Sequence, residues 1–220
     1  HIIYIDGTFT GKTEISSTTL LNTDMLTLRG YIPEGQTVAK ATLNGEFSSF
    51  GETNTTLIIN GAKKVDIYDL TIKGGNNNSS DYGTHASPGG GILINGSAEV
   101  TLGSGATITE NTACYGGGVS VFNGKLTVND GAVISKNTAK KDNYEGGYGG
   151  GIYVGKNGSL LLAGGMIGDS TSLDNGNNAI QGGGIYLAYN DDDVIRVEMT
   201  GGSVSHNLKK SGGSSRHAAG

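Results

Sequence analysis

The chain has 220 residues, of which 40 are glycine and only 2 are proline, and its formal net charge at pH 7 is −5. A collagen triple helix is excluded, because it requires glycine at every third position and abundant proline. Charged residues are 16% and hydrophobic residues 35% of the chain, which excludes both a charge-solvated disordered chain and a helical bundle. Lysine and arginine never cluster beyond two in a row, so we expect no nucleic-acid partner, and the apolar runs are too short for a membrane span.

Residues 1–88 alternate apolar and polar side chains, but without a regular repeat. We expect residues 1–9 to form a terminal strand and residues 64–72 to form one longer alternating strand. The Asn-Gly pairs at 44–45 and 60–61 indicate turns between them. No linker divides this part from the rest, so the sequence predicts a single domain over residues 1–220, with irregular N-terminal coils at 1–88.

Residues 89–207 contain a regular repeat that begins each time with three glycines, at 89–91, 116–118, 149–151 and 182–184. After each triplet come a short apolar strand, an Asn-containing turn, a second alternating strand, a Gly-containing turn and a third strand. The predicted first strands are 92–94, 119–121, 152–154 and 185–187. The predicted second strands are 100–102, 126–128, 160–162 and 197–199. The third strands carry Ile108, Ile134, Ile167 and Val204.

Short strands with one apolar face are unstable alone, but stacking unit on unit buries those faces in a continuous column. The sequence therefore predicts an all-β parallel β-helix with three short strands per coil, in which Ile134 and Leu160 point inward. Residues 74–88, 138–148 and 171–181 are polar insertions, which we expect at one corner of the coils. We expect residues 208–220 to form a C-terminal tail or a truncated coil.

Asparagine recurs three residues after an inward apolar position, at Asn111, Asn137 and Asn207. An inward asparagine at a corner can bond the turn backbone and the asparagine of the next coil, which predicts a structural ladder. Ser170 is expected to replace asparagine in the third unit. The glycine triplets permit positive φ and close backbone approach, and we assign structural turns to Gly91, Gly118, Gly151 and Gly184.

Residues 108–119 and 134–154 resemble the repeat of bacterial surface proteins related to the polymorphic outer-membrane proteins. In that repeat an apolar residue, two further residues and asparagine precede Gly-Gly and a branched apolar residue. Residues 57–75 are similar to the opening coils of pectate-lyase-like right-handed β-helices. The resemblance implies a right-handed coil and a secreted or cell-surface protein. The chain departs from the surface-protein repeat in carrying Ile or Val, rather than Phe, before the asparagine.

Enzymes with the pectate-lyase-like fold cleave acidic polysaccharides with carboxylates and basic residues, or with paired aspartates. Asp66 and Asp69 are three residues apart in a predicted strand, so we expect them on opposite faces. Glu198 has no acidic neighbour. We assign no catalytic residue and expect no enzyme activity, because no carboxylate or arginine occurs at the outward positions of the first strands, Leu93, Ser120, Tyr153 and Tyr186.

Other patterns typical of ligand sites lead to no metal or cofactor assignment. Residues 150–157 come close to a phosphate-binding loop, but Asn157 and a strand follow where Ser or Thr and a helix are needed. Residues 191–193 are three aspartates, which we interpret as a solvated turn. Cys114 is expected to be a buried or half-buried thiol. Metal-ligand spacing is absent from the four histidines, His1, His85, His206 and His217.

These patterns favour a non-enzymatic extracellular or cell-surface structural or adhesive protein. A carbohydrate-binding module that uses Tyr153 and Tyr186, whose rings can stack on one face, is one alternative. A polysaccharide lyase or hydrolase is another. A β-helix leaves unpaired strand edges at both ends, and neither terminus has the pattern of a polar cap. We therefore expect head-to-tail self-association or pairing with the remainder of a longer chain, besides a glycan or host-surface ligand. Because the chain starts at His1, we expect that a leader or upstream sequence has been removed.

Overall fold

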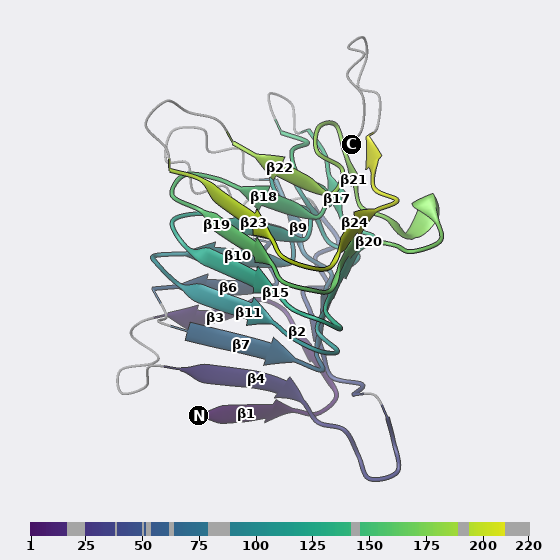
Figure 1. The fold of residues 1–220 in the computed structure, drawn as a ribbon. Helices are drawn as coiled ribbons and strands as arrows, with labels where there is room; N and C mark the ends of the chain where they lie inside the picture. The colour runs from purple at the N-terminus through teal and green to yellow at the C-terminus, as the bar shows by residue number, and fades with distance from the viewer. Residues whose placement is uncertain are drawn as a thin grey trace.

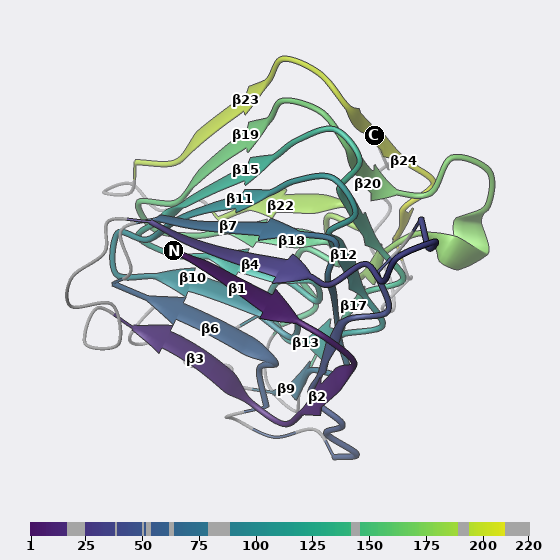
Figure 2. The same ribbon diagram turned by 90° about the horizontal axis from the view of Figure 1, so that it is seen from below.

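The computed structural model describes residues 1–16, 25–37, 39–49, 51, 54–61, 64–78, 89–141, 146–188 and 194–209. Its strands stack in parallel into four sheets, as successive coils of a right-handed parallel β-helix (Figure 1). The predicted fold class is confirmed. Figure 2, which shows the molecule from below, shows the sheets surrounding one interior.

We call the four sheets A, B, C and D. Within a complete coil the chain passes through them in the order A, B, D, C. Sheet A contains β1 (Ile2–Ile5), β4 (Leu26–Gly30), β7 (Lys64–Tyr68), β11 (Glu99–Leu102), β15 (Lys125–Val128), β19 (Ser159–Leu162) and β23 (Arg196–Met199). Sheet B contains β2 (Thr8–Thr10), β5 (Thr42–Asn44), β8 (Thr71–Lys73), β12 (Thr107–Thr109), β16 (Val133–Ser135), β20 (Met166–Gly168) and β24 (Ser203–Ser205).

The other two sheets complete each coil. Sheet C contains β3 (Thr13–Ser16), β6 (Leu57–Asn60), β10 (Ile92–Asn95), β14 (Val119–Val121), β18 (Ile152–Val154) and β22 (Ile185–Leu187). Sheet D consists of two-residue strands, β9 (Asn76–Asn77), β13 (Thr112–Ala113), β17 (Thr138–Ala139), β21 (Asn178–Ala179) and β25 (Leu208–Lys209). A single turn of 3-10 helix, η1 (Leu173–Asn175), precedes β21.

The core is a stack of inward side chains, one from each strand of a column. In sheet B the register runs from Phe9 through Leu43, Ile72, Ile108, Ile134 and Ile167 to Val204. Ile134 and Leu160 both belong to the buried core, as the alternation predicts. Alternating side chains lie on opposite faces of a strand, so the few apolar residues of this polar chain are sufficient to fill the interior.

Two N-terminal predictions are wrong because each predicted strand is bent at a corner. Residues 64–72 form β7 and β8 in different sheets, since Asp69 has a φ of 51° and turns the chain between them. Leu70 follows the corner and is buried in the core. Residues 1–9 likewise divide into β1 and β2 at Gly7, whose φ is 80°.

The coil has a fourth side that the three-strand pattern did not include. The two-residue strands of sheet D follow the corner asparagines. These strands are too short for an alternating pattern to show in the sequence. They also separate the insertions, so the prediction of a single decorated corner is wrong. Residues 169–177 lie before β21, whereas residues 140–148 follow β17. Residues 79–88, 142–145 and 210–220, which complete the other predicted insertions and the tail, lie outside the described residues.

Candidate functional site

A column of asparagine side chains follows the corner between sheets B and D. Oδ1 of Asn137 accepts hydrogen bonds from the backbone nitrogen of Asn111 at 3.1 Å and from its Nδ2 at 3.0 Å. Asn177 accepts the same pair from Asn137, and Asn207 from Asn177. Each Nδ2 also donates to a carbonyl of the preceding coil, that of Ile72, Ile108, Ile134 or Ile167. Each amide therefore holds two coils in register.

The assignment of Ser170 to this column is wrong, because Asn177 occupies the third-unit position. The extra residues 169–176 carry η1, so the asparagine comes seven residues later than the spacing of the other units predicts. Oδ1 of Asp169 accepts from the backbone nitrogens of Thr171 and Ser172, both at 2.8 Å, and these bonds lower the pKa of Asp169. A sequence signal existed, since Asn-x-Ala recurs at 111–113, 137–139 and 177–179.

The third glycine of each triplet lies against the asparagine column. A Cβ on Gly118 would lie 2.7 Å from the carbonyl oxygen of Gly151 and 2.9 Å from Nδ2 of Asn137. Close approach, rather than positive φ, is thus what requires glycine at the positions assigned from the sequence, Gly91, Gly118, Gly151 and Gly184. Positive φ occurs instead at the first glycine of three of the four triplets, Gly116, Gly149 and Gly182.

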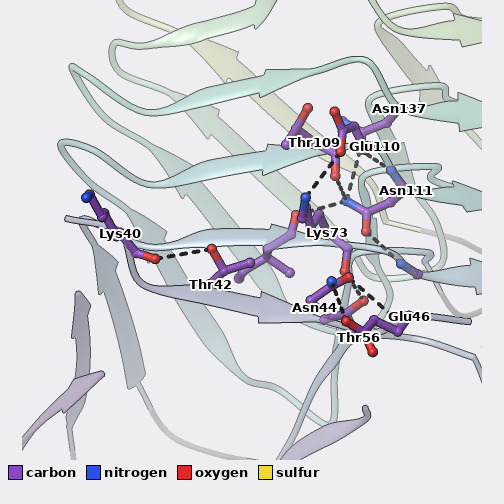
Figure 3. A network of polar contacts seen from close by, with 12 residues as sticks. Lys40, Thr42, Asn44, Glu46, Thr56, Lys73, Thr109, Glu110, Asn111 and Asn137 are labelled. Atoms are coloured by element: carbon purple, nitrogen blue, oxygen red, sulfur yellow. Dashed lines mark hydrogen bonds and ion pairs between the residues drawn. The ribbon is translucent and has the colours of Figure 1, made fainter. Parts of the chain in front are cut away.

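Beside the ladder, the same corner carries further polar side chains, which range from buried to exposed (Figure 3). Nζ of Lys73 lies 3.6 Å from Oε2 of Glu110, and Oγ1 of Thr56 donates to the carbonyl of Lys73 at 2.9 Å. Nδ2 of Asn44 donates to Oε1 of Glu46 at 3.2 Å. Exposed ion pairs contribute about 0–1 kcal/mol, so this network orders the corner but concentrates no charge for catalysis.

Tyr153 and Tyr186 are register partners on β18 and β22, and their rings stack with centroids 5.8 Å apart and planes 6° apart. Two tyrosines that the sequence analysis did not assign extend this pair. Tyr148 lies 4.8 Å from Tyr186, and Tyr115 lies 5.2 Å from Tyr153, measured between ring centroids. We call these four residues the tyrosine cluster. Tyr115 and Tyr148 share one sequence signal, since each directly precedes a glycine triplet.

The other outward positions of this column do not extend the aromatic surface. Leu93 and Ser120 share the register with Tyr153, yet both are buried. Tyr115 is buried too, whereas Tyr148, Tyr153 and Tyr186 are half-buried. The exposed part of the tyrosine cluster is therefore confined to the two coils nearest the C-terminal end.

The carboxylates weighed for catalysis lie in different places. Asp66 and Glu198 belong to one outward column of sheet A but are four strands apart. At a strand spacing of about 4.8 Å their backbones are roughly 19 Å apart, well beyond the ~5–10 Å of paired glycosidase carboxyls. Asp69 lies at a corner, where its Oδ2 is 3.7 Å from Nε of Arg29.

The remaining candidates from the sequence also stay apart. Within the described residues no group of three His, Cys, Asp or Glu side chains could hold a metal ion. Nδ1 of His206 lies 2.9 Å from the carbonyl oxygen of Asp169, and Cys114 is buried. Residues 150–157 lead from β18 toward β19, so a strand follows where a phosphate site needs a helix. The described part excludes His85, His217 and residues 191–193.

Both ends of the β-helix expose side chains of the inner columns. Ile3 and Phe9 at the N-terminal end are 50% and 55% exposed. Met199 and Val204 at the C-terminal end are 57% and 40% exposed, and Leu187 is exposed as well. These residues alternate with outward polar positions, so they belong to the core columns and are uncovered only because no described strand lies beyond them.

Comparison of the chain with protein-family models, with curated proteins and with solved structures finds no match. The described residues include no helix with the length and apolar character needed to cross a membrane. The functional argument therefore depends on the surfaces of the β-helix itself.

Proposed function

We propose that this chain is a non-enzymatic, secreted or cell-surface structural and adhesive protein whose β-helices stack end to end into fibres. The observation that carries the proposal is the matching exposure of inner columns at the two ends. Ile3 and Met199 end one column of sheet A, and Phe9 and Val204 end one column of sheet B. A second copy placed head to tail would continue each column with an apolar neighbour, as would further coils of a longer chain.

The polar positions at the two ends are compatible with the same joint. Continued in register, Ser203 and Ser205 of one copy would meet Thr8 and Thr10 of the next, and Glu198 would meet Ile2. On sheet C, Tyr186 would meet Glu14. None of these pairs opposes like charges, which would destabilise a strand pairing. A head-to-tail contact does not close on itself, so repetition produces a filament.

The test is assembly of the purified chain, followed by sedimentation velocity and electron microscopy over a concentration series. We expect concentration-dependent fibres for the wild type and a folded monomer for Met199→Asp, because a charge in the joint would be buried without a partner. Thr127→Asp, on the outer face of sheet A between Thr101 and Leu161, is the matched control and should assemble normally. A wild type that stays monomeric at every concentration, or a Met199→Asp variant that still assembles, would contradict the proposal.

The stacked rings of Tyr153 and Tyr186 favour a second candidate function, glycan binding by the tyrosine cluster. Parallel half-buried rings at adjacent strands offer a flat aromatic surface to the apolar face of a sugar. We expect Tyr153→Ala to remove binding on a glycan array while leaving fibre formation intact. Equal binding by wild type and variant would exclude this surface as the glycan site.

A third candidate function is enzymatic, that of a polysaccharide lyase or hydrolase of the pectate-lyase-like type. The separation of Asp66 from Glu198 argues against it, as does the pairing of Asp69 with Arg29. We expect no release of reducing ends or unsaturated products from pectin, alginate, chondroitin or hyaluronan. Product formation that is lost in Asp66→Asn or Asp69→Asn would establish enzyme activity.

A further inference from the structure

A surface pocket with aromatic and charged walls lies at the corner that follows the first strands of sheet A. Two of its lining residues, Tyr4 of β1 and Arg29 of β4, belong to a register column that continues to Tyr68 of β7. Cζ of Arg29 lies 4.7 Å from the ring centroid of Tyr68, a cation–π contact that fixes the guanidinium on one side. Tyr4, on the other neighbouring strand, is 61% exposed.

Asp69 forms the second charged wall of this pocket. Its Oδ2 lies 3.7 Å from Nε of Arg29, which is within ion-pair distance but too long for a hydrogen bond. Nε of Arg29 is buried and has no hydrogen-bond partner in the described structure. The guanidinium is thus positioned by the ring of Tyr68 and the charge of Asp69, while its buried Nε–H has no acceptor.

The corner itself is rigidly built. A Cβ on Gly30 would collide with the carbonyl oxygen of Asp69, so the two coils approach as closely as glycine allows. The backbone nitrogen of Tyr31 donates to the carbonyl of Ile5 at 2.7 Å, and that of Asp69 donates to Ser104 at 3.0 Å. The backbone that carries Tyr31 and Asp69 is therefore preformed, which lowers the entropy cost of binding.

The pocket has a volume of about 360 Å³ and is lined by Tyr4, Arg29, Gly30, Tyr31, Ile32 and Asp69. This volume lies at the small end of the roughly 300–1,000 Å³ range of small-molecule sites. The lining contains one positive and one negative side chain, so its formal charge is zero. Tyr31, like Tyr4, is exposed and adds a second accessible ring.

We propose that this pocket binds a neutral sugar residue of a glycan. A sugar ring has apolar C–H faces, which pack on aromatic rings, and hydroxyl groups, which both donate and accept hydrogen bonds. Arg29 supplies donors, Asp69 supplies an acceptor, and Tyr4 and Tyr31 supply the rings. An acidic sugar fits less well, because its carboxylate would lie beside that of Asp69.

This site borders the proposed fibre joint, because Tyr4 follows Ile3 on β1, but Arg29, Tyr31 and Asp69 lie outside the terminal strands and no tyrosine of the cluster lines it. It lies on sheet A at the N-terminal end, whereas the tyrosine cluster lies on sheet C toward the C-terminal end. Its aromatic walls are outward, so stacking of the inner columns does not require them. Failure of fibre assembly and failure of this site can therefore be told apart.

The test is titration of the purified chain with methyl β-galactoside, methyl α-mannoside, N-acetylglucosamine and lactose, and with glucuronic acid as the acidic counterpart. The chain contains 10 tyrosines and no tryptophan, so tyrosine fluorescence reports ring contacts without a dominant background. Isothermal calorimetry gives the affinity. We expect saturable binding of at least one neutral sugar and at least tenfold weaker binding of glucuronic acid.

Variants locate the binding to this pocket. Tyr31→Ala and Arg29→Met should each weaken binding at least tenfold, whereas Tyr31→Phe, which keeps the ring, should retain it. Arg196→Met, which removes an exposed arginine outside the pocket, is the matched control and should bind as the wild type does. Thermal unfolding followed by circular dichroism verifies that each variant is folded.

Three results would overturn the proposal. The first is no saturable binding of any of the four neutral sugars. The second is a preference for glucuronic acid that increases in Asp69→Asn, which would indicate an acidic ligand instead. The third is binding that Tyr153→Ala abolishes and Tyr31→Ala leaves unchanged, which would assign the glycan to the tyrosine cluster.

Discussion

The central and terminal coils of this β-helix share the same column positions but differ in what covers them. In one column of sheet B, Ile108 and Ile134 are completely buried, whereas Phe9 and Val204, at its two ends, are about half exposed. The side chains are equally apolar, and only the presence of a coil on both sides differs. Burial in this fold is therefore supplied by neighbouring coils, and each coil is only as stable as its neighbours make it.

The asparagine ladder shows the same difference for polar groups. Asn137 is fully buried and bonds to both neighbouring ladder asparagines, while Asn207 at the C-terminal end is half-buried and, within the described residues, bonds to one ladder asparagine, Asn177. Loss of a buried partner leaves unsatisfied groups on both sides, but at an end water can replace it. Paired substitutions in central and terminal coils test this comparison directly.

The largest expected effect is that of Ile134→Asp. The change loses about 1.5–3 kcal/mol of apolar burial and adds roughly 3–5 kcal/mol for an unpaired buried charge. The sum approaches a typical total stability of about 5–15 kcal/mol, so we expect the cooperative folded state to be lost. Circular dichroism and urea unfolding measure whether a cooperative unfolding transition remains.

The control for Ile134→Asp is Val204→Asp, which changes the exposed end of the same column. Measured below the concentration of fibre assembly, it should cost only about 1 kcal/mol or less. Equal destabilisation by the two variants would show that the terminal coil is as well covered as the central one.

The next effect is that of Asn137→Ala. The substitution removes the acceptor for Asn111 and the donor to the Ile108 carbonyl, so we expect a loss of about 2–4 kcal/mol at a typical 1–3 kcal/mol per unsatisfied group. Asn207→Ala should cost about 1 kcal/mol, because its groups are accessible to water. Urea unfolding compares the two variants through their midpoint concentrations, provided that the dependence of the unfolding free energy on urea is unchanged. A larger loss for Asn207→Ala would contradict the ladder's dependence on neighbouring coils.

Gly118→Ala is expected to destabilise the fold by about 1–3 kcal/mol through overpacking. Its new Cβ would press on the backbone carbonyl of Gly151, which two coils hold in place. Gly184→Ala should cost less, since its Cβ would approach the side chains of Asn207 and Val204 in the terminal coil, which can shift. Thermal unfolding midpoints test the order, and a reversed order would be evidence against it.

The smallest effect concerns pH and the insertion before β21. The pKa of Asp169 is lowered, chiefly by the backbone nitrogens of Thr171 and Ser172, so ionised Asp169 stabilises the folded state above its ordinary value of 3.8. That contribution is lost as the pH falls through the folded-state pKa. The thermal midpoint of Asp169→Asn should therefore lie slightly below that of the wild type near pH 7 and converge with it in acid. A difference that grows in acid would refute this assignment.

The repeat, the strands and the inner columns of residues 89–207 follow from the order of apolar and polar residues. Alternation around residues such as Ile134 and Leu160 gives each unit one apolar face. Stacking of the units buries that face. The spacing of Asn111 and Asn137 was regular enough to predict their common corner. Before Asn177 the repeat is longer, so its spacing does not show which residue joins the asparagine ladder. The hydrogen bonds between coils show that it is Asn177.

The contacts between coils depend on the tertiary structure. The corner at Gly7 could not be read from alternation, because Ile3, Ile5 and Phe9 keep the same phase across it. At Asp69 the inward residues change from positions 65 and 67 to 70 and 72, and this change of phase is the sequence signal of the corner. Tyr115 and Tyr148 join Tyr153 and Tyr186 only because loops from different coils return to one sheet. The pocket around Arg29 likewise combines three strands far apart in sequence, and its chemistry depends on parallel register, which no segment of the chain encodes alone.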